Sequence, residues 1–370
     1  MNICIFVGAR PNFIKVAPVV RVVRKAQEQG KNLAFHLVFA GAADDSTLEG
    51  SLFDDLQIPP PDVCLGVVCE NLNELTGQVM SKFENYLQHT PTDAVIVVDD
   101  LASTMAAAIV TKKQGILLAH LAAGTRSFDI SMPKEINRLV IDGLSDLLFT
   151  AGISNNSIAN KEGAELSKVY MVGNILIDNI RYNQTRLLRP AILEQLEIAD
   201  GSYIVFTLNR KALMADKENL CQMLLSMLRA AGDTPILAPL RDKAVQTVMS
   251  LALQERLGKL KNFHVIPPMG YLEFGYLTAH AMGVITDSGN VAEEATFNSV
   301  PCITLNSYTE HIETVKVGSN VLVGENADSL GEAVAMMVEK KWKTCSIPDR
   351  WDGRSAERIV QTLLEVHQRR

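Results

Sequence analysis

The chain has 370 residues, of which 47% are hydrophobic and 21% are charged, and its formal net charge is −7 at pH 7. This length fits two domains that each bury a substantial core, and it excludes a small fold held together by disulfides. The net charge excludes the basic surface that is typical of proteins that bind nucleic acid or anionic membranes. An anionic ligand must therefore meet cations that are concentrated locally.

The cysteine and histidine patterns indicate neither a metal site nor a disulfide framework. The six cysteines are scattered along the chain, and no Cys or His spacing is that of a zinc site. The N-terminus enters an apolar strand without a signal-peptide pattern, and no apolar run approaches the length of a membrane span. We therefore predict a cytoplasmic protein with no metal, no cofactor and no membrane partner.

The first half of the chain alternates short β-branched runs with segments of helical periodicity, which is typical of parallel βαβ units. The first strand, Asn2–Val7, leads through Gly8-Ala9-Arg10-Pro11 into a helix that ends near Gly30. Further strands are expected at 33–39, 93–98, 116–120, 147–150 and 169–172, and helices at 75–87, 103–114 and 136–144.

The second half repeats this pattern after a junction at Val172-Gly173-Asn174. A helical stretch over 178–196 precedes strands expected at 203–207, 235–238, 262–266, 282–286, 302–305 and 321–323. The last segment, 354–368, has the periodicity of an amphipathic helix. The predicted fold class is α/β, with two Rossmann-like doubly wound domains, 1–173 and 174–352, facing across a cleft. A C-terminal helix within 353–370 is expected to pack back on the N-terminal domain.

Strand-to-helix loops are the candidate sites, because open parallel sheets bind ligands beyond the carboxyl ends of their strands. In the first loop, Arg10 offers bidentate donors to a phosphate, and Lys15 lies one turn into the following helix. After the strand at 282–286, the small residues of Ser288-Gly289-Asn290 let backbone amides approach a phosphate, and Glu294 follows one turn on. A turn with a surface arginine, and simple helix capping, explain the same residues without a ligand.

Three further loops gather polar side chains. The adjacent carboxylates Asp99 and Asp100 directly follow the strand expected at 93–98. Because side chains alternate along a strand, only one of the two is expected to face a ligand. The cationic pair Arg210-Lys211 follows the strand at 203–207, where a solvated turn is the alternative. The connection from 120 to 138 is the most polar of the three, and its polar side chains are His120, Arg126, Glu135, Asn137 and Arg138. A buried loop also needs such groups to satisfy its own backbone, so some of them can be structural.

Taken together, these loops resemble the non-hydrolysing UDP-N-acetylglucosamine 2-epimerase family, which has the glycosyltransferase-B fold. The resemblance runs nearly from end to end, through Gly-Ala-Arg-Pro at 8–11, Asp100 and the segments 120–126, 133–138, 172–174, 271–274, 286–294 and 309–310. It implies that UDP is eliminated across C1 and C2 of the sugar and that re-addition yields the other C2 epimer. It also implies a homodimer that acts in polysaccharide biosynthesis.

The resemblance also assigns roles to residues. Arg10 and Ser288 through Asn290 would contact the diphosphate, Phe274 would line the uracil pocket and Glu294 would hold the ribose. Substrate-binding or catalytic positions are also matched by Lys15, Asp100, Asn209, Arg210 and His311.

The sequence departs from the family pattern where the chemistry occurs. Ala122 stands at the position of a catalytic glutamate, Lys134 replaces the first of two adjacent glutamates, and Asn209 replaces a histidine. Asp100 and Glu135 are then the remaining acid and base candidates. Other departures are His311 for an arginine, Asn290 for a glycine, Met269 for a glutamine, and Ala42 and Ala43 at a regulatory UDP-sugar site.

The leading hypothesis is therefore a UDP-N-acetylglucosamine 2-epimerase-like enzyme that is slow or acts on an altered sugar. The alternative is a catalytically impaired paralogue that binds a nucleotide sugar. A glycosyltransferase of the same fold is a third possibility, because one scaffold hosts many chemistries.

Overall fold

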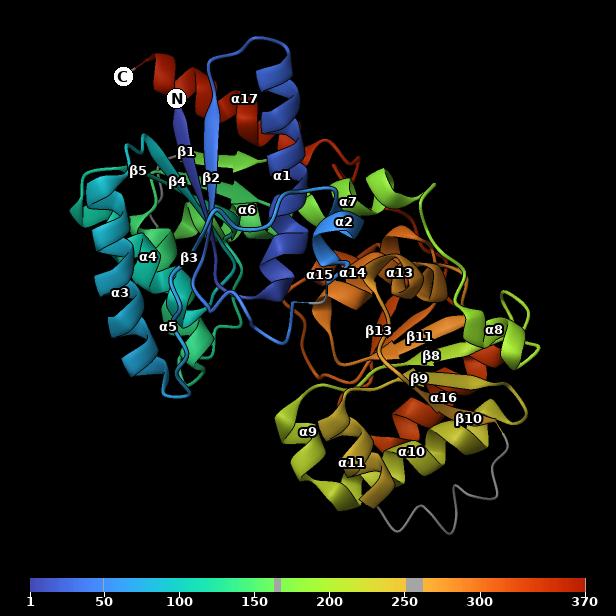
Figure 1. The fold of residues 1–370 in the computed structure, drawn as a ribbon. Coiled ribbons are helices and arrows are strands. Elements are labelled where there is room, and N and C mark those ends of the chain that lie inside the picture. The colour runs from blue at the N-terminus through green and yellow to red at the C-terminus, as the bar shows by residue number, and fades with distance from the viewer. Residues whose placement is uncertain (49, 163–167, 251–261, 370) are drawn as a thin grey trace. The chain divides into compact units, whose positions relative to one another are not determined.

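The computed structural model describes residues 1–48, 50–162, 168–250 and 262–369, which form two units (Figure 1). Unit 1 comprises Met1–Tyr182 and Asp349–Arg370, and unit 2 comprises Asn183–Pro348. Each unit is built on one parallel sheet with helices between successive strands, so the expectation of two doubly wound α/β domains is confirmed. The boundaries predicted at 173 and 352 lie close to these divisions.

Unit 1 contains a seven-stranded sheet in the order β3-β2-β1-β4-β5-β6-β7. The chain reverses its direction of progress between β1 and β4, so the topological switch point lies there. The strands are β1 (Asn2–Val7), β2 (Ala34–Phe39), β3 (Val63–Cys64), β4 (Ala94–Val98), β5 (Leu117–Ala123), β6 (Leu147–Thr150) and β7 (Val169–Met171). The helices are α1 (Arg10–Glu28), α2 (Leu52–Leu56), α3 (Leu72–His89), α4 (Ala102–Lys113), α5 (Pro133–Leu144), α6 (Ile153–Lys161), α7 (Ile175–Asn183) and α17 (Ser355–Gln368).

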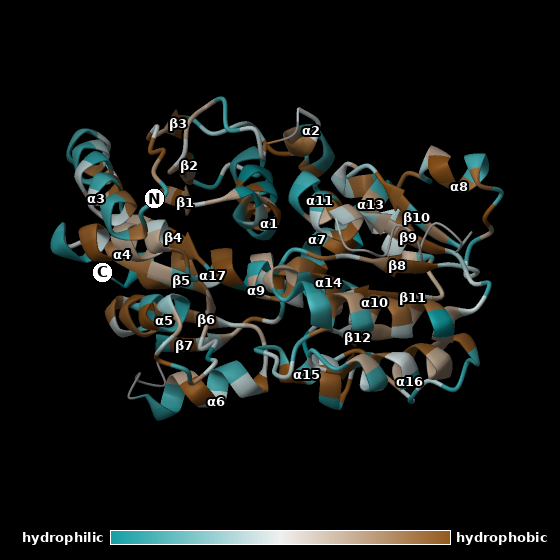
Figure 2. Ribbon diagram, turned by 90° about the horizontal axis from the view of Figure 1, so that it is seen from below, coloured by the Kyte–Doolittle hydropathy of each residue, from teal (hydrophilic) through white to brown (hydrophobic). Residues whose placement is uncertain are grey.

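The alternation of side chains along the strands divides the core of unit 1 between two faces. On one face, Phe6 of β1 packs edge-on against Phe83 of α3, with ring centroids 5.0 Å apart. On the other face, Phe39 of β2 contacts Phe13 of α1 at 5.5 Å. Helices α3, α4 and α5 therefore cover one face, and α1 packs with α17 on the other (Figure 1). Figure 2 shows the hydrophobic strands enclosed by helices with more hydrophilic outer surfaces.

Unit 2 contains a six-stranded sheet in the order β10-β9-β8-β11-β12-β13, with its switch point between β8 and β11. Its strands are β8 (Ile204–Phe206), β9 (Ile236–Pro239), β10 (Phe263–Ile266), β11 (Gly283–Thr286), β12 (Cys302–Thr304) and β13 (Asn320–Leu322). Its helices are α8 (Ala191–Gln195), α9 (Lys211–Ala215), α10 (Lys217–Ala231), α11 (Asp242–Ser250), α13 (Tyr271–Ala279), α14 (Gly289–Phe297), α15 (Ile312–Lys316) and α16 (Ala327–Val338).

The single helical stretch predicted over 178–196 is wrong. Helix α7 ends at Asn183, and α8 begins at Ala191, directly after Pro190. Pro190 has no backbone N–H to donate, and its ring disfavours the helical conformation of the preceding residue, so the segment divides there.

The C-terminal helix α17 packs against α1 within unit 1. Its first turn is capped from a distance, because the carboxylate of Asp178 accepts hydrogen bonds from the amides of Ser355 (3.1 Å) and Ala356 (2.8 Å). Arg358 adds a hydrogen bond to the carbonyl oxygen of Val172 at 2.7 Å. Across the described residues, the helices are too short or too polar to span a membrane.

Candidate functional site

The candidate site of unit 1 lies at the carboxyl edge of its sheet, where the loops after β1, β4 and β5 meet at the switch point. Three non-glycine residues at this edge adopt left-handed backbone conformations: Asp99 after β4 (φ 60°), Ala122 near the end of β5 (φ 69°) and Phe128 in the loop after β5 (φ 61°). Such conformations are costly for alanine and are often found at functional sites. Ala122 also marks a register irregularity between β5 and β6, where the chain carries one extra residue.

The loop that carries Arg10 is closed by a residue that the sequence analysis missed. The side-chain oxygen of Asn12 accepts hydrogen bonds from the amides of Gly8 (3.0 Å) and Ala9 (3.2 Å). These two amides are therefore engaged within the chain, and the phosphate role predicted for this loop depends on the half-buried Arg10 side chain. The local signal for Asn12 is a polar side chain two residues into a helix that begins with Arg-Pro.

Asp99 holds this loop to the end of β4. Its carboxylate accepts hydrogen bonds from Lys15 Nζ at 2.6 Å and from Asn12 Nδ2 at 2.8 Å. The side chains of Lys15 and Asp99 are only 10% and 19% exposed. Lys15, predicted as a substrate-binding residue, is therefore committed to an intramolecular ion pair in this structure.

Asp100 has a different partner from its neighbour, although strand alternation is not the cause, because both residues lie beyond the end of β4 and Asp99 has a left-handed backbone. The Oδ2 of Asp100 receives the Nε (2.8 Å) and Nη2 (2.6 Å) of Arg138 on α5, and Asn137 Nδ2 donates to its carbonyl oxygen. Its Oδ1 lies 3.5 Å from Lys134 Nζ. Burial opposes ionisation of Asp100, but Lys134 and Arg138 outweigh it and lower the pKa of the carboxyl. Asp100 is thus a carboxylate at neutral pH.

Glu135 is fully engaged by hydrogen-bond donors. Its side chain is buried and accepts hydrogen bonds from the amide and hydroxyl of Ser127 (2.9 Å each), from the Phe128 amide (3.0 Å) and from Arg138 (3.0 Å). Burial raises the pKa of this carboxyl, but the donors of Ser127, Phe128 and Arg138 lower it further than burial raises it. This arrangement suits a loop anchor better than a proton acceptor.

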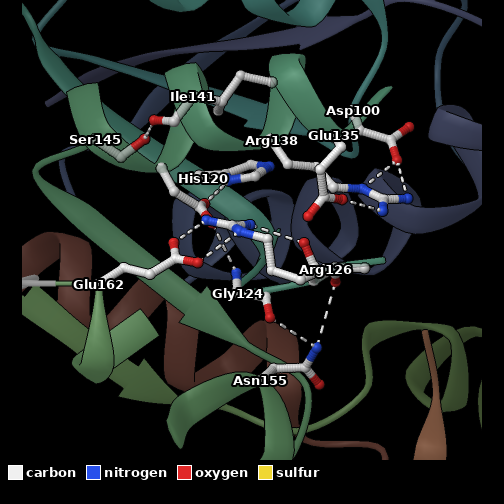
Figure 3. A network of polar contacts seen from close by, with 12 residues as sticks. Asp100, His120, Gly124, Arg126, Glu135, Arg138, Ile141, Ser145, Asn155 and Glu162 are labelled. Carbon is white, nitrogen blue, oxygen red and sulfur yellow. Dashed lines mark hydrogen bonds and ion pairs between the residues drawn. The ribbon is translucent and has the colours of Figure 1, made fainter. Parts of the chain in front are cut away.

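A buried ionic network holds the connection after β5, as Figure 3 shows. His120 Nδ1 lies 2.6 Å from Asp142 Oδ1, and its Nε2 lies 2.9 Å from the Asp99 carbonyl oxygen. Asp142 Oδ2 also receives Arg126 (2.8 Å) and the Gly124 amide (3.1 Å). Both ring nitrogens of His120 therefore face acceptors, so the histidine is a structural link rather than an exposed catalyst.

Arg126 extends this network to α6. Its guanidinium pairs with Glu162 as well as with Asp142. Asn155 on α6 donates to the Gly124 carbonyl oxygen at 3.4 Å (Figure 3). These contacts tie the loop to three elements, so much of its polarity serves the fold.

A cavity of about 530 Å³ opens beside the same edge, between Gly8, Ser103 and the loops that follow β2 and β3. Its lining includes Ala42, at a position matched to the family's regulatory UDP-sugar site, together with Asp44 and Asp45. The residues described around this cavity include no lysine, arginine or histidine. Its charge therefore disfavours a second diphosphate.

The candidate site of unit 2 occupies the equivalent edge, where β8 and β11 end side by side. Thr207 and Thr286 share a hydrogen bond of 2.7 Å between their hydroxyl groups. Asp287 Oδ2 accepts the amides of Asn209 and Arg210, both at 2.6 Å, and burial raises the pKa of this carboxyl despite those bonds. The loop 207–210 is therefore fixed to the loop that carries Ser288.

Arg210 is held by the segment that follows β12. Its guanidinium contacts the Asn306 side chain and the Leu305 carbonyl oxygen, and it pairs with Glu325 at 3.1 Å. Asn209 lies beside it at the end of the same loop, although its side-chain role stays a prediction.

The first turn of α14 presents the predicted diphosphate residues. Ser288 is the N-cap of this helix and forms no side-chain capping bond, and Gly289 and Asn290 are its first two residues. The ring of His311 lies close to Gly289, since a β-carbon built there would be 3.2 Å from His311 Cδ2. His311 Nδ1 lies 3.0 Å from Glu293 Oε1.

Glu294 and Phe274 lie on neighbouring helices of unit 2, α14 and α13. Burial and, secondarily, the adjacent Glu293 raise the pKa of Glu294 to about 7. Phe274 is half-buried. The unit thus brings together a helix N-terminus, a titratable carboxyl and an aromatic side chain, which are groups suited to a nucleoside diphosphate.

Comparisons with known proteins agree with this arrangement. A family described as UDP-N-acetylglucosamine 2-epimerase matches residues 25–364. A UDP-N-acetylglucosamine 2-epimerase of Methanocaldococcus jannaschii is 34% identical and covers 98% of this chain and 99% of its own length. A UDP-2,3-diacetamido-2,3-dideoxy-D-glucuronate 2-epimerase of Pseudomonas aeruginosa is 33% identical over 99% of this chain and 100% of its own.

Solved structures extend the comparison to the fold. The crystal structure of the M. jannaschii epimerase in complex with UDP-GlcNAc and UDP has a TM-score of 0.85 and 32% identity, and covers 99% of this chain and 100% of that one. The Neisseria meningitidis enzyme bound to UDP-GlcNAc has a TM-score of 0.85 and 26% identity, with the same coverage. The predicted glycosyltransferase-B type of fold is confirmed.

Proposed function

Because this chain belongs to the UDP-N-acetylglucosamine 2-epimerase family of isomerases, we propose that it binds a UDP-linked 2-acetamido sugar and slowly interconverts its two C2 epimers, with Asp100 as the acid–base group. Relatives with this chemistry are named for a neutral sugar, N-acetylglucosamine, and for an acidic one, a diacetamido glucuronate. Both sugars carry the nitrogen substituent at C2 next to the anomeric carbon.

The proposed reaction needs a proton acceptor on one face of C2, a proton donor on the other face and a stabilised leaving group. Asp100 is proposed as the group on one face, and a water molecule as its counterpart on the other. A base removes the proton from C2, the new C1–C2 double bond forms, and the C1–O bond breaks so that UDP departs with the electron pair. Re-addition of UDP at C1 and proton delivery to the opposite face of C2 restore the sugar with inverted configuration. No oxidant or reductant is consumed.

The observation that carries this proposal is the position of the Asp100 carboxylate. Of the carboxylates at the edge of unit 1, Asp99 is held by Lys15 and Asn12, and Glu135 accepts four hydrogen bonds. Asp100 differs because Arg138 is bonded to its Oδ2, while its Oδ1 lies 3.5 Å from the Nζ of the exposed Lys134. Its lowered pKa makes it a weak base, which is the physical reason to expect slow turnover.

Unit 2 is proposed to hold the UDP. Amides at the start of α14 and the Arg210 side chain suit the diphosphate, and Asn209 and His311 offer further donors, whereas the diphosphate role of Arg10, in unit 1, stays a prediction from the sequence. Glu294 is proposed to accept the ribose hydroxyls, and Phe274 to pack on uracil. Homodimerisation, a cytoplasmic location and a role in polysaccharide biosynthesis stay predictions from the sequence.

Proton exchange at C2 tests the proposed reaction directly. Incubation with UDP-N-acetylhexosamines in heavy water is expected to place deuterium at C2 slowly, as followed by NMR. Asp100→Asn is expected to abolish the exchange while leaving UDP affinity within about twofold. Exchange that persists in Asp100→Asn would refute the assignment of Asp100.

A second candidate function is binding of a UDP-sugar without turnover. It is favoured by the methyl group of Ala122, which cannot exchange a proton, and by the four hydrogen bonds that Glu135 accepts. This candidate predicts that the parent chain binds UDP in a thermal-shift assay and shows no exchange. It also predicts that an Ala122→Glu, Lys134→Glu, Asn209→His variant gains exchange. A parent chain that fails to bind UDP would contradict both candidates.

A further inference from the structure

Lys134 occupies a position that helix electrostatics disfavour. It is the second residue of α5, where the N-terminal end of the helix dipole is positive and acidic side chains are the stabilising choice. Arg138 lies one turn further on and adds a second cation. A residue that opposes the local preference without a gain for the fold points to a role toward a ligand.

The fold does not need Lys134 to hold Asp100. The side chain of Arg138 is 3% exposed, and its Nε (2.8 Å) and Nη2 (2.6 Å) already bond to Asp100 Oδ2. The Lys134 ammonium stands 3.5 Å from Oδ1, and its side chain is 58% exposed. An ammonium group has three donors, so Lys134 keeps capacity for a second acceptor.

Resting on the proposed function, we propose that Lys134 recognises a carboxylate on the sugar, so that the preferred substrates are UDP-linked 2-acetamido uronic acids. A sugar whose C2 proton is within reach of Asp100 lies within one ring of the Lys134 ammonium, because the two side chains are in contact. Arg138 is shared between the carboxylates of Asp100 and Glu135, and Lys134 is the exposed cation at this point, at the positive N-terminal end of α5. A uronate carboxylate gains from the Lys134 ammonium, whereas the hydroxymethyl group of N-acetylglucosamine does not.

The contact between Lys134 and Asp100 also explains how an acidic sugar is tolerated near the Asp100 carboxylate. Arg138 is shared between Asp100 Oδ2 and Glu135 Oε2, so the exposed Lys134 is the cation placed to face a substrate carboxylate. A neutral or acidic residue at 134 would leave the substrate carboxylate opposite Asp100 without a counter-charge.

Affinity measurements on a matched ligand pair test this inference. Calorimetric titration with UDP, UDP-N-acetylglucosamine and UDP-N-acetylglucosaminuronate is expected to show a preference of about fivefold for the uronate, the scale of a solvent-exposed ion pair. Lys134→Gln should remove the preference and Lys134→Glu should reverse it, while the affinity for UDP itself is unchanged. The preference should also shrink at high ionic strength.

The control is Lys113→Gln, which removes an exposed lysine from the last turn of α4. It is expected to leave the preference intact. Equal affinities of the parent for the two sugars, or a preference that survives Lys134→Gln, would overturn the specificity inference while UDP binding still upheld the proposed function. Absence of binding to UDP alone would overturn the proposed function and this inference with it.

Discussion

The ion pair between Lys15 and Asp99 is expected to contribute measurably to the stability of unit 1. Its atoms are 2.6 Å apart, and the two side chains are 10% and 19% exposed. Exposed pairs contribute roughly 0.2–1 kcal/mol, and breaking a fully buried pair costs about 3–5 kcal/mol. This pair lies between those limits, so we expect a coupling free energy of about 2 kcal/mol.

A double-mutant cycle of Asp99→Asn and Lys15→Met measures this coupling. Asparagine suits the left-handed backbone at position 99, so the first substitution removes charge without adding backbone strain. Urea unfolding should be followed in a Trp342→Phe background, because the remaining tryptophan, Trp351, is buried in unit 1 and reports that unit alone.

The surface pair Lys112–Asp146 provides the matched control. Its atoms are 2.8 Å apart, but its side chains are 29% and 25% exposed. We expect its coupling to be at most about 1 kcal/mol. If the Lys15–Asp99 cycle gave no more than this control, the claim that Asp99 anchors the Arg10 loop electrostatically would be refuted.

Three further predictions concern pH, capping and backbone strain. Since the folded-state pKa of Glu294 is raised to about 7 from an ordinary 4.5, the stability of unit 2 should fall as pH rises from about 4.5 to about 7, and thermal melts of Glu294→Gln should lose that fall. Asp178→Ala should cost about 1–2 kcal/mol and accelerate hydrogen exchange at the first amides of α17, whereas unchanged exchange would contradict the capping role. Ala122→Gly should stabilise unit 1 by about 1 kcal/mol in urea unfolding, because glycine tolerates φ 69°. Gly124→Ala should destabilise unit 1, because a β-carbon at position 124 would be 2.3 Å from the Asn155 carbonyl oxygen.

The parts of the fold that follow from local patterns were predictable from the sequence. The apolar run Ala94–Val98 is wholly buried in β4, and the small residues after β11 do begin a helix. Because the carboxyl ends of parallel strands share one edge, these patterns also located the loops that carry Asp100 and Ser288. Helix α2 and the two-residue strand β3 were not predicted, since such short elements have too little periodicity.

The partners of the site residues were not predictable, because they come from distant segments. Asn12 and Asp99 are 87 residues apart in sequence, and they meet only because β1 and β4 are neighbours in the sheet. The contact of Asn12 with the Gly8 and Ala9 amides is the local exception, because its place in the first turn of α1 lets its side chain occupy amides that had seemed open to a phosphate. Asp99 and Asp100 lie beyond the end of β4, and Asp99 has a left-handed backbone, so strand alternation does not account for their different partners.

Binding of UDP and proton transfer at the sugar are proposed to depend on different loops of this protein. The left-handed conformation and the extra residue at Ala122 persist although alanine has no functional group, because His120, Asp142 and Arg126 fix the surrounding loop. A side chain at position 122 can therefore change without disturbing the loop that carries it. Proton transfer needs a carboxylate at such a position, whereas the groups proposed to grip UDP lie on other loops. If position 122 is that of a catalytic glutamate, as the family resemblance implies, alanine there should lower turnover far more than affinity, and the exchange and thermal-shift experiments separate these two effects.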